Sequence, residues 1–285
     1  MAVRTTPPKF GEQARAALNA LFAAAHERSP FSFLCTMLRV EPASEEEWDP
    51  LTESHAALTQ YATQIQARPG GASLTALEDR RLAVLIYCHL TEVAAVYQLL
   101  ANAMRCAEGK PYRTDPFRDL STPDVRPPLR RPPTPAQMIA RLEDLEPVPR
   151  NLLPLLDSFF DPDLRDAFYR SEYFLTKDSL RYRTVAGPIR TLAWADAEDL
   201  VRRAMAFYNA FFGEFFLWMQ KLGKMPRQEK LEGGIEVELL DAADGTLCGI
   251  QWMREDGMPC SFLRLHGAVS CNGIVFSPAG EIVRE

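Results

Sequence analysis

The sequence predicts a mainly α-helical chain that ends in a small antiparallel β-meander. Over residues 1–230, apolar side chains recur three and four positions apart, which is the spacing of one helix face. From Ile235 onward they alternate with polar side chains, the period of a strand. Turn dipeptides divide this tail at regular intervals, at Asp244-Gly245, Asp256-Gly257 and Asn272-Gly273. We therefore expect a helical bundle over residues 1–230 and an acidic β-meander over residues 231–285.

The clearest predicted helix runs from Leu74 to Cys106. Ser73 precedes it as an N-cap, and Gly109 and Pro111 end it. At 1.5 Å per residue it would be roughly 50 Å long, and its apolar faces require cover from other helices. We interpret it as the central pillar of the bundle. Two shorter amphipathic helices are expected before it, over Glu12–Glu27 and Leu51–Ala67.

A proline-rich connection comes next, over residues 110–135, because eleven of the 22 prolines lie between positions 111 and 154. It is predicted to be extended and locally basic, through Arg126, Arg130 and Arg131; the alternative is a plain linker. Five elements are expected after it, in this order: a helix from Thr134 or Pro135 to Leu145, a short apolar segment at Asn151–Phe160, a helix capped by Asp161 that runs to Phe174, a hairpin of Leu180–Arg183 and Ile189–Leu192, and a helix over Ala197–Leu222 capped by Asp196.

The last of these helices is dense in aromatic residues, more than one helix face can bury. This density predicts a contact with a protein partner or a second copy of the chain, through this helix or the β-tail. Internal core is the equally supported alternative.

Charge and composition exclude several classes of protein. The net charge is −6, and the tail from residue 231, with nine acidic and three basic residues, accounts for all of it. A simple basic nucleic-acid binder is therefore disfavoured, although a polyanion would meet less repulsion on residues 1–230. Neither a secretory signal nor an apolar run of roughly 18–20 residues is found, so no membrane association is expected. Six scattered cysteines without a C-x2-C pair predict reduced thiols and a cytoplasmic protein.

Few residues suggest metal or cofactor chemistry. Cys248, Cys260, His266 and Cys271 lie near one another in sequence, but they lack the paired spacing of a zinc site, so no metal and no cofactor are predicted. His89 and Glu92 are three residues apart on the pillar and share a helix face. They predict either a polar cleft or a hydrogen-bonded core histidine.

One segment resembles a known family. Residues 164–173 read Leu-Arg-Asp-Ala-Phe-Tyr-Arg-Ser-Glu-Tyr, which is similar to the motif of HEPN-domain proteins. That motif has an arginine, a polar residue that is often Asn, a few residues and then a histidine. Residues 86–92, Tyr97, Asn102 and the Gly109–Tyr112 segment resemble the long helix of one branch of that family and the residues just beyond that helix. The resemblance covers about residues 74–222.

The resemblance implies an RNA-binding or RNA-cutting homodimer. In such ribonucleases the arginine and histidine of two protomers act on one RNA strand without metal. Histidine titrates near neutral pH and can move a proton, and arginine can hold a phosphate through a bidentate contact. Residues implied here to contact RNA are Arg165, Tyr169, Arg170 and Asn102.

The sequence departs from the motif at the histidine position, which is Arg170, and at Asp166 in place of Asn. A guanidinium stays protonated and is a poor general base. On a regular helix Arg165 and Arg170 would also lie about 140° apart and face different directions, unless the helix ends or bends there. The structural alternative pairs Arg165 with Asp161 or Asp166.

These observations leave three functional hypotheses. The favoured one is a HEPN-like protein with a degenerate ribonuclease site, which binds RNA or regulates an RNA-cutting partner. The second is an active, metal-independent endoribonuclease of a defence or toxin system, with His89 as substitute base and Arg165, Arg170 and His89 as catalytic candidates. The third is a helical scaffold without a nucleic-acid role.

Overall fold

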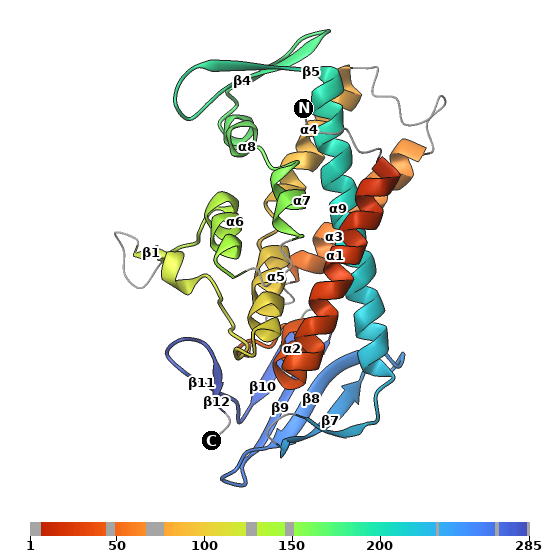
Figure 1. Ribbon diagram of the computed structural model, residues 1–285, viewed down its shortest axis with the longest axis vertical. Coiled ribbons are helices and arrows are strands. Elements are labelled where there is room, and N and C mark those ends of the chain that lie inside the picture. The colour runs from red at the N-terminus through yellow and green to blue at the C-terminus, as the bar shows by residue number, and fades with distance from the viewer. Residues whose placement is uncertain are drawn as a thin grey trace. The chain divides into compact units, whose positions relative to one another are not determined.

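The computed structural model describes residues 7–43, 49–66, 77–123, 130–145, 151–231, 234–265 and 268–283 (Figure 1). Just over half of the described residues are helical, and the C-terminal strands form an antiparallel sheet. The prediction of helices followed by a C-terminal β-meander is thus confirmed at this level. The chain divides into two compact units, each made of three segments: Met1–Ala17, Pro50–Ala94 and Arg150–Phe212 in the first, and Leu18–Asp49, Ala95–Pro149 and Gly213–Glu285 in the second.

The first unit contains helices and a three-stranded antiparallel sheet. Its elements are α3 (Pro50–Gln66), α4 (Leu77–Thr91), α7 (Leu153–Asp157), α8 (Pro162–Tyr169), the strands β3 (Tyr173–Leu175), β4 (Ser179–Arg183) and β5 (Ile189–Ala193), and the first parts of α1 (Pro7–Arg28) and α9 (Trp194–Gly223). Large aromatic side chains fill its core. Phe159 of the α7–α8 connection packs on Phe207 of α9 with ring centroids 5.4 Å apart, and both are fully buried. The predicted hairpin is found, as β4 and β5.

The predicted pillar is not one helix. α4 ends at Thr91, and α5 (Ala94–Ala107) begins three residues later. At the break, the amides of Glu92 and Val93 donate to carbonyls three residues back, each over 3.1 Å, which tightens and ends the last turn. Neither Gly nor Pro marks this break, and sequence periodicity therefore did not reveal it. The predicted start at Ser73 and Leu74 lies outside the residues that the structure describes.

The stretch Leu77–Ala107, which comprises α4 and α5, is the one helical stretch in the described ranges that is long and apolar enough to cross a membrane. Of its most apolar 18-residue window, 56% is buried inside the protein. Core helices of soluble proteins pass the same test.

Helix α8 is shorter than predicted. Asp161 caps it as expected, and Oδ1 of its side chain accepts from the amide of Leu164 over 3.0 Å. The helix ends at Tyr169 rather than Phe174, because Ser171 adopts a left-handed conformation with φ of 59° that a helix cannot continue. The residues beyond it form β3.

The second unit contains a five-stranded sheet, smaller two-stranded sheets and several helices. Its elements are α2 (Pro30–Leu38), α5, a 3-10 turn (Arg118–Leu120), β1 (Thr122–Pro123), β2 (Arg130–Arg131), α6 (Pro135–Glu143), β6 (Gln228–Lys230), β7 (Glu236–Asp241), β8 (Leu247–Met253), β9 (Pro259–Leu265), β10 (Ala268–Asn272), β11 (Val275–Phe276), β12 (Ile282–Val283) and the last parts of α1 and α9. Thr134 caps α6 in a capping box with Gln137, as its position in the sequence predicted.

The five-stranded sheet is a meander in the order β10-β9-β8-β7-β6. Gly245 and Gly257 each have φ of 80° in the predicted turns on either side of β8, a conformation that glycine adopts without strain. The sheet buries one face, and Trp252 on that face contacts Phe31 of α2 in a T-shaped arrangement at 5.3 Å. Neither α2 nor β6 was predicted.

The described part of the proline-rich connection is anchored within the second unit. The hydroxyl of Tyr112 donates to the Val40 carbonyl over 2.6 Å, and Nε of Arg113 donates to Glu281 over 2.8 Å. Further along, β1 pairs with β2. Arg126 lies outside the described residues, as do the side chains of Arg130 and Arg131, so the local basic surface stays a prediction.

Most aromatic side chains of α9 are buried within their own units. Trp218, for example, packs against both His26 and Phe33. Phe216 is an exception at 42% exposed, and the neighbouring aliphatic Leu217 is 47% exposed. Core packing therefore accounts for most of the aromatic density, and a partner contact through this helix stays a prediction.

Candidate functional site

Asp161 fixes the position of α8 in the first unit. Its backbone amide donates to the hydroxyl of Tyr87 on α4 over 2.8 Å, and that hydroxyl in turn donates to the Phe159 carbonyl over 2.8 Å. Oδ2 of Asp161 accepts from the hydroxyl of Tyr182 on β4 over 2.7 Å and from Arg190 on β5 over 3.1 Å. Asp161, which is 7% exposed, thus joins α8 to both a helix and the sheet. Such a buried, fully hydrogen-bonded carboxylate holds its neighbours in one arrangement.

Arg165, the first arginine of the motif, is held by two carboxylates of its own chain. Its Nε donates to Oε1 of Glu92, at the α4–α5 break, and its Nη1 donates to Oδ1 of Asp166 over 2.6 Å. The hydrogen bond to Glu92 is the largest cause that raises the pKa of Arg165 above its ordinary value. The guanidinium also lies 5.3 Å from the centroid of the Tyr169 ring. The structure thus shows the predicted pairing with Asp166, and Glu92 takes the place of Asp161 as the second partner.

Arg170 reaches the same aspartate from the other side. Its Nη2 donates to Oδ2 of Asp166 over 3.2 Å, and its side chain is 52% exposed. Arg170 occupies the C-cap of α8 and keeps a right-handed helical backbone, and its amide donates to the Asp166 carbonyl over 3.1 Å. The two arginines meet through the side chain of Asp166, which directly follows Arg165 and precedes Arg170 by four residues. Asp166 therefore joins Arg165 and Arg170, one to each carboxylate oxygen.

The structure does not bring the other candidate residues into this cluster. His89 lies on α4 with a buried Nε2 that has no hydrogen-bond partner among the described residues, whereas Glu92 and Asp166 are the groups that the arginines contact. Asn102 belongs to the second unit and is 3% exposed; its side-chain amide donates to the Arg113 carbonyl and accepts from the Arg113 amide, at 2.9 and 3.0 Å. Asn102 thus bonds to the backbone of its own unit, and the RNA contact expected of it stays a prediction. Tyr169 is 54% exposed and stays available.

Chemically, the cluster can hold an anion but lacks a proton carrier for neutral pH among the residues described. Two guanidinium groups and the carboxylates of Glu92 and Asp166 balance in charge. The nearby thiol of Cys88 does not supply a carrier, because burial, with a smaller contribution from Glu92, raises its pKa to about 12. Arg170 is the group most able to exchange partners, since its ion pair with Asp166 is long and its side chain is half exposed.

Glu92 has a different polar neighbour from the one that the sequence predicted. Its presence in an apolar helix was a signal of a polar contact, but helix spacing assigned it to His89. The partner is Arg165, 73 residues away. Periodicity within one helix cannot find such a pair.

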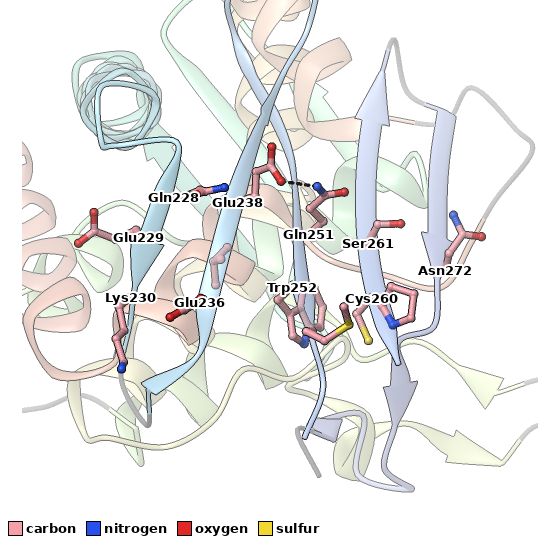
Figure 2. Close-up of a pocket in the computed structure, with 13 residues that line it drawn as sticks. Gln228, Glu229, Lys230, Glu236, Glu238, Gln251, Trp252, Cys260, Ser261 and Asn272 are labelled. Carbon is pink, nitrogen blue, oxygen red and sulfur yellow. Dashed lines mark hydrogen bonds between the residues drawn. The ribbon is translucent and has the colours of Figure 1, made fainter. Parts of the chain in front are cut away.

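Apart from this cluster, a hollow lies on the outer face of the five-stranded sheet, with a volume of about 660 Å³. Figure 2 shows a row of polar side chains across all five strands, and the register confirms it: Gln228, Glu238, Gln251, Ser261 and Asn272. Within this row, Nε2 of Gln251 donates to Glu238 over 2.5 Å. The row offers amides, a hydroxyl and a carboxylate for polar contacts, without a nucleophile paired to a base.

No group of three or more His, Cys, Asp or Glu residues in the described ranges is placed to hold a metal ion. His266 of the predicted cysteine and histidine set lies outside those ranges. In comparisons with known proteins, no family model matches the chain, and neither a curated protein nor a solved structure is significantly similar to it.

Proposed function

We propose that this chain is a HEPN-like protein that binds RNA, or regulates an RNA-cutting partner, without cutting RNA itself. The observation that carries the proposal is the meeting of Arg165 and Arg170 on Asp166 at the exposed end of α8. Arg165 stands at the arginine position of the HEPN motif, and Arg170 stands at its histidine position, where the sequence departs from the motif. A guanidinium is the group that protein sites commonly use for phosphate recognition.

The absence of cutting is expected from the acid–base chemistry of Arg170. Attack by a ribose 2′-hydroxyl on the neighbouring phosphate needs a group that accepts and returns a proton near pH 7. Arg170 cannot do so, because its guanidinium stays charged. Loss of such help commonly costs about 10²–10⁴ in rate. The substitute base, His89, forms no hydrogen bond through its buried Nε2 to either arginine or to any other described residue.

The two arginines have different tasks in this proposal. The side chain of Arg165 is 22% exposed and is bound by two carboxylates, so it holds the cluster in place. Arg170 pairs with Asp166 over 3.2 Å and can turn from it to a phosphate. Because Asp166 competes for it, binding would be weak in one chain. A homodimer, which the HEPN resemblance implies, would present two such clusters and raise the affinity by multivalency.

The experiment compares RNA binding and cutting for matched arginine variants. Binding of fluorescein-labelled single-stranded RNA of mixed sequence is measured by anisotropy at several salt concentrations, and cutting is read on denaturing gels. Arg170→Gln should weaken binding and lower the salt slope by about one. Arg202→Gln is the control, because Arg202 of α9 is 53% exposed and also pairs with an aspartate of its own helix.

Cutting by the purified protein that is lost in Arg165→Ala would overturn the proposal in favour of an active endoribonuclease. Loss of that cutting in His89→Ala, at unchanged stability, would identify His89 as the substitute base. Absence of RNA binding at low salt, or binding that salt does not weaken, would favour the helical scaffold.

A further inference from the structure

The sheet formed by β3, β4 and β5 has one face that the described part of the chain leaves exposed. On this face Phe174, Arg181 and Thr191 are direct cross-strand neighbours, and Arg183 pairs with Ile189 in the next row. Phe174 is 66% exposed and Ile189 is 55% exposed. Exposed aromatic and aliphatic side chains in neighbouring rows mark a surface that contacts a partner.

The opposite face holds this surface in place. Leu180 and Tyr182 of β4 are buried, and Tyr182 and Arg190 bond to Asp161 at the start of α8. In Figure 1, β4 and β5 form a hairpin beside α8. A surface that is already ordered loses little conformational entropy on binding.

The exposed face is basic in an acidic protein. Arg181 and Arg183 of β4 lie on this face, whereas Arg190 of β5 lies on the opposite face; residues 170–193 as a whole contain five basic and two acidic side chains in a chain of net charge −6. The side chain of Arg181 has no hydrogen bond or ion pair in the described part of the chain, and Arg183 donates from Nη1 to the Gly187 carbonyl over 3.1 Å. Both guanidinium groups therefore keep donors for an anion.

A hollow of about 390 Å³ lies among these groups, and its lining includes Phe174, Arg181, Arg183 and Ile189. Ser171 and Glu172 line it too, so it begins at the residues that directly follow Arg170. The amide of Arg183 donates to the Glu172 carbonyl over 3.0 Å, which holds this end of the motif against β4. The hollow and the arginine cluster are therefore connected along the chain.

We infer that this face binds single-stranded RNA, with a base stacked on Phe174 and the phosphates held by Arg181 and Arg183. An aromatic ring opposite one arginine, with a second arginine in the next row, suits a single strand, whose bases stack on rings while arginines follow the backbone. The inference rests on the proposed function and deepens it, since it names the surface and the form of the RNA. The positive charge of the segment is the complement of that ligand.

The test uses the full chain and the same labelled single-stranded RNA. Phe174→Leu keeps an apolar side chain but removes the ring, and it should weaken binding about tenfold. Phe174→Tyr keeps the ring and should bind as the original protein does. Arg181→Gln should weaken binding severalfold and lower the salt slope by about one. Both positions lie on the exposed face, so circular dichroism and the unfolding midpoint should not change.

The outcomes separate this inference from the proposed function. If the original protein binds RNA and Arg170→Gln weakens it, but Phe174→Leu and Arg181→Gln do not, this inference is overturned while the proposed function stands. If the original protein does not bind RNA at any salt concentration, both fail. Equal affinity for double-stranded RNA, or equal competition by polyglutamate, would also overturn it, because neither ligand offers an unpaired base to Phe174.

Discussion

Glu92, which directly follows α4, accepts a hydrogen bond from Nε of Arg165, the first arginine of the motif, across 73 residues of sequence. The break between α4 and α5 falls at this glutamate. The contact assigns Arg165 a structural task in the folded chain, and it leaves Arg170 as the more available cation.

The first prediction concerns this ion pair. Glu92→Gln should lower the free energy of unfolding by about 1–2 kcal/mol, because the pair lies between exposed pairs, which contribute little, and buried ones, which contribute more. Urea denaturation measures the change. Glu172→Gln is the control, since Glu172 is exposed and its carboxylate has no partner among the described residues. Equal effects of the two substitutions would contradict the structural task assigned to Glu92.

The second prediction concerns the hydroxyl of Tyr182. Tyr182→Phe should destabilise the fold by about 1.5–3 kcal/mol, because Asp161 would lose a hydrogen bond to a buried charge. Burial and the hydrogen bond to Asp161 both raise the pKa of Tyr182, so the phenol stays protonated and the bond persists well above neutral pH. Tyr169→Phe removes a hydroxyl from a half-exposed tyrosine and should change stability little. The comparison is made by thermal and urea unfolding of both variants.

The third prediction concerns the reactivity of Cys88. Its pKa of about 12 means that the native thiol is almost entirely protonated between pH 7 and 9, and the side chain is fully buried. Alkylation by iodoacetamide at Cys88 should be far slower in the native protein than in urea, where the thiol has its ordinary pKa. Peptide mass spectrometry reads the modification. Fast native labelling of Cys88 would show that α4 opens readily.

The fourth prediction concerns stability below pH 7. Burial, with a smaller contribution from Lys221, lowers the pKa of His26 below its ordinary value of 6.5, and burial lowers that of His55. The unfolded chain then binds protons that the folded chain does not. The contribution of these two histidines to the free energy of unfolding is therefore complete above pH 6.5, and it is lost as the pH falls through their lowered pKa values.

The loss of stability is measured as the decrease of the unfolding midpoint from pH 7.5 to 6.5 and 5.5. His26→Phe should make this decrease smaller, and the phenyl ring would still pack against Phe33 and Trp218. Adding His55→Phe should make the midpoint depend on pH still less. An unchanged slope in the double variant would mean that other groups cause the acid sensitivity.

Local signals in the sequence predicted the parts of the fold that depend on local chemistry. Asp161 and Thr134 cap helices through their own side chains, and Gly245 and Gly257 occupy the turns where positive φ is needed. Each of these depends on residues within a few positions. The alternating pattern after Ile235 likewise predicted the meander.

The rest depended on tertiary contacts. Periodicity continues through the α4–α5 break, because the apolar residues on both sides are buried. The end of α8 is set by the left-handed backbone of Ser171, a residue type without strong preference for that conformation. The candidate site was predicted in part: Arg165, Arg170 and Asp166 come together, whereas His89 and Asn102 do not join them.

The contacts of Asp161 also order the events of folding. Its cap on Leu164 spans three residues, its bond to Tyr182 spans 21, and the bond from its amide to Tyr87 spans 74. Closing longer loops costs more chain entropy, so the cap can form early while the link to Tyr87 waits for the chain to collapse. Asp161→Ala should therefore slow refolding, whereas Tyr87→Phe should mainly accelerate unfolding.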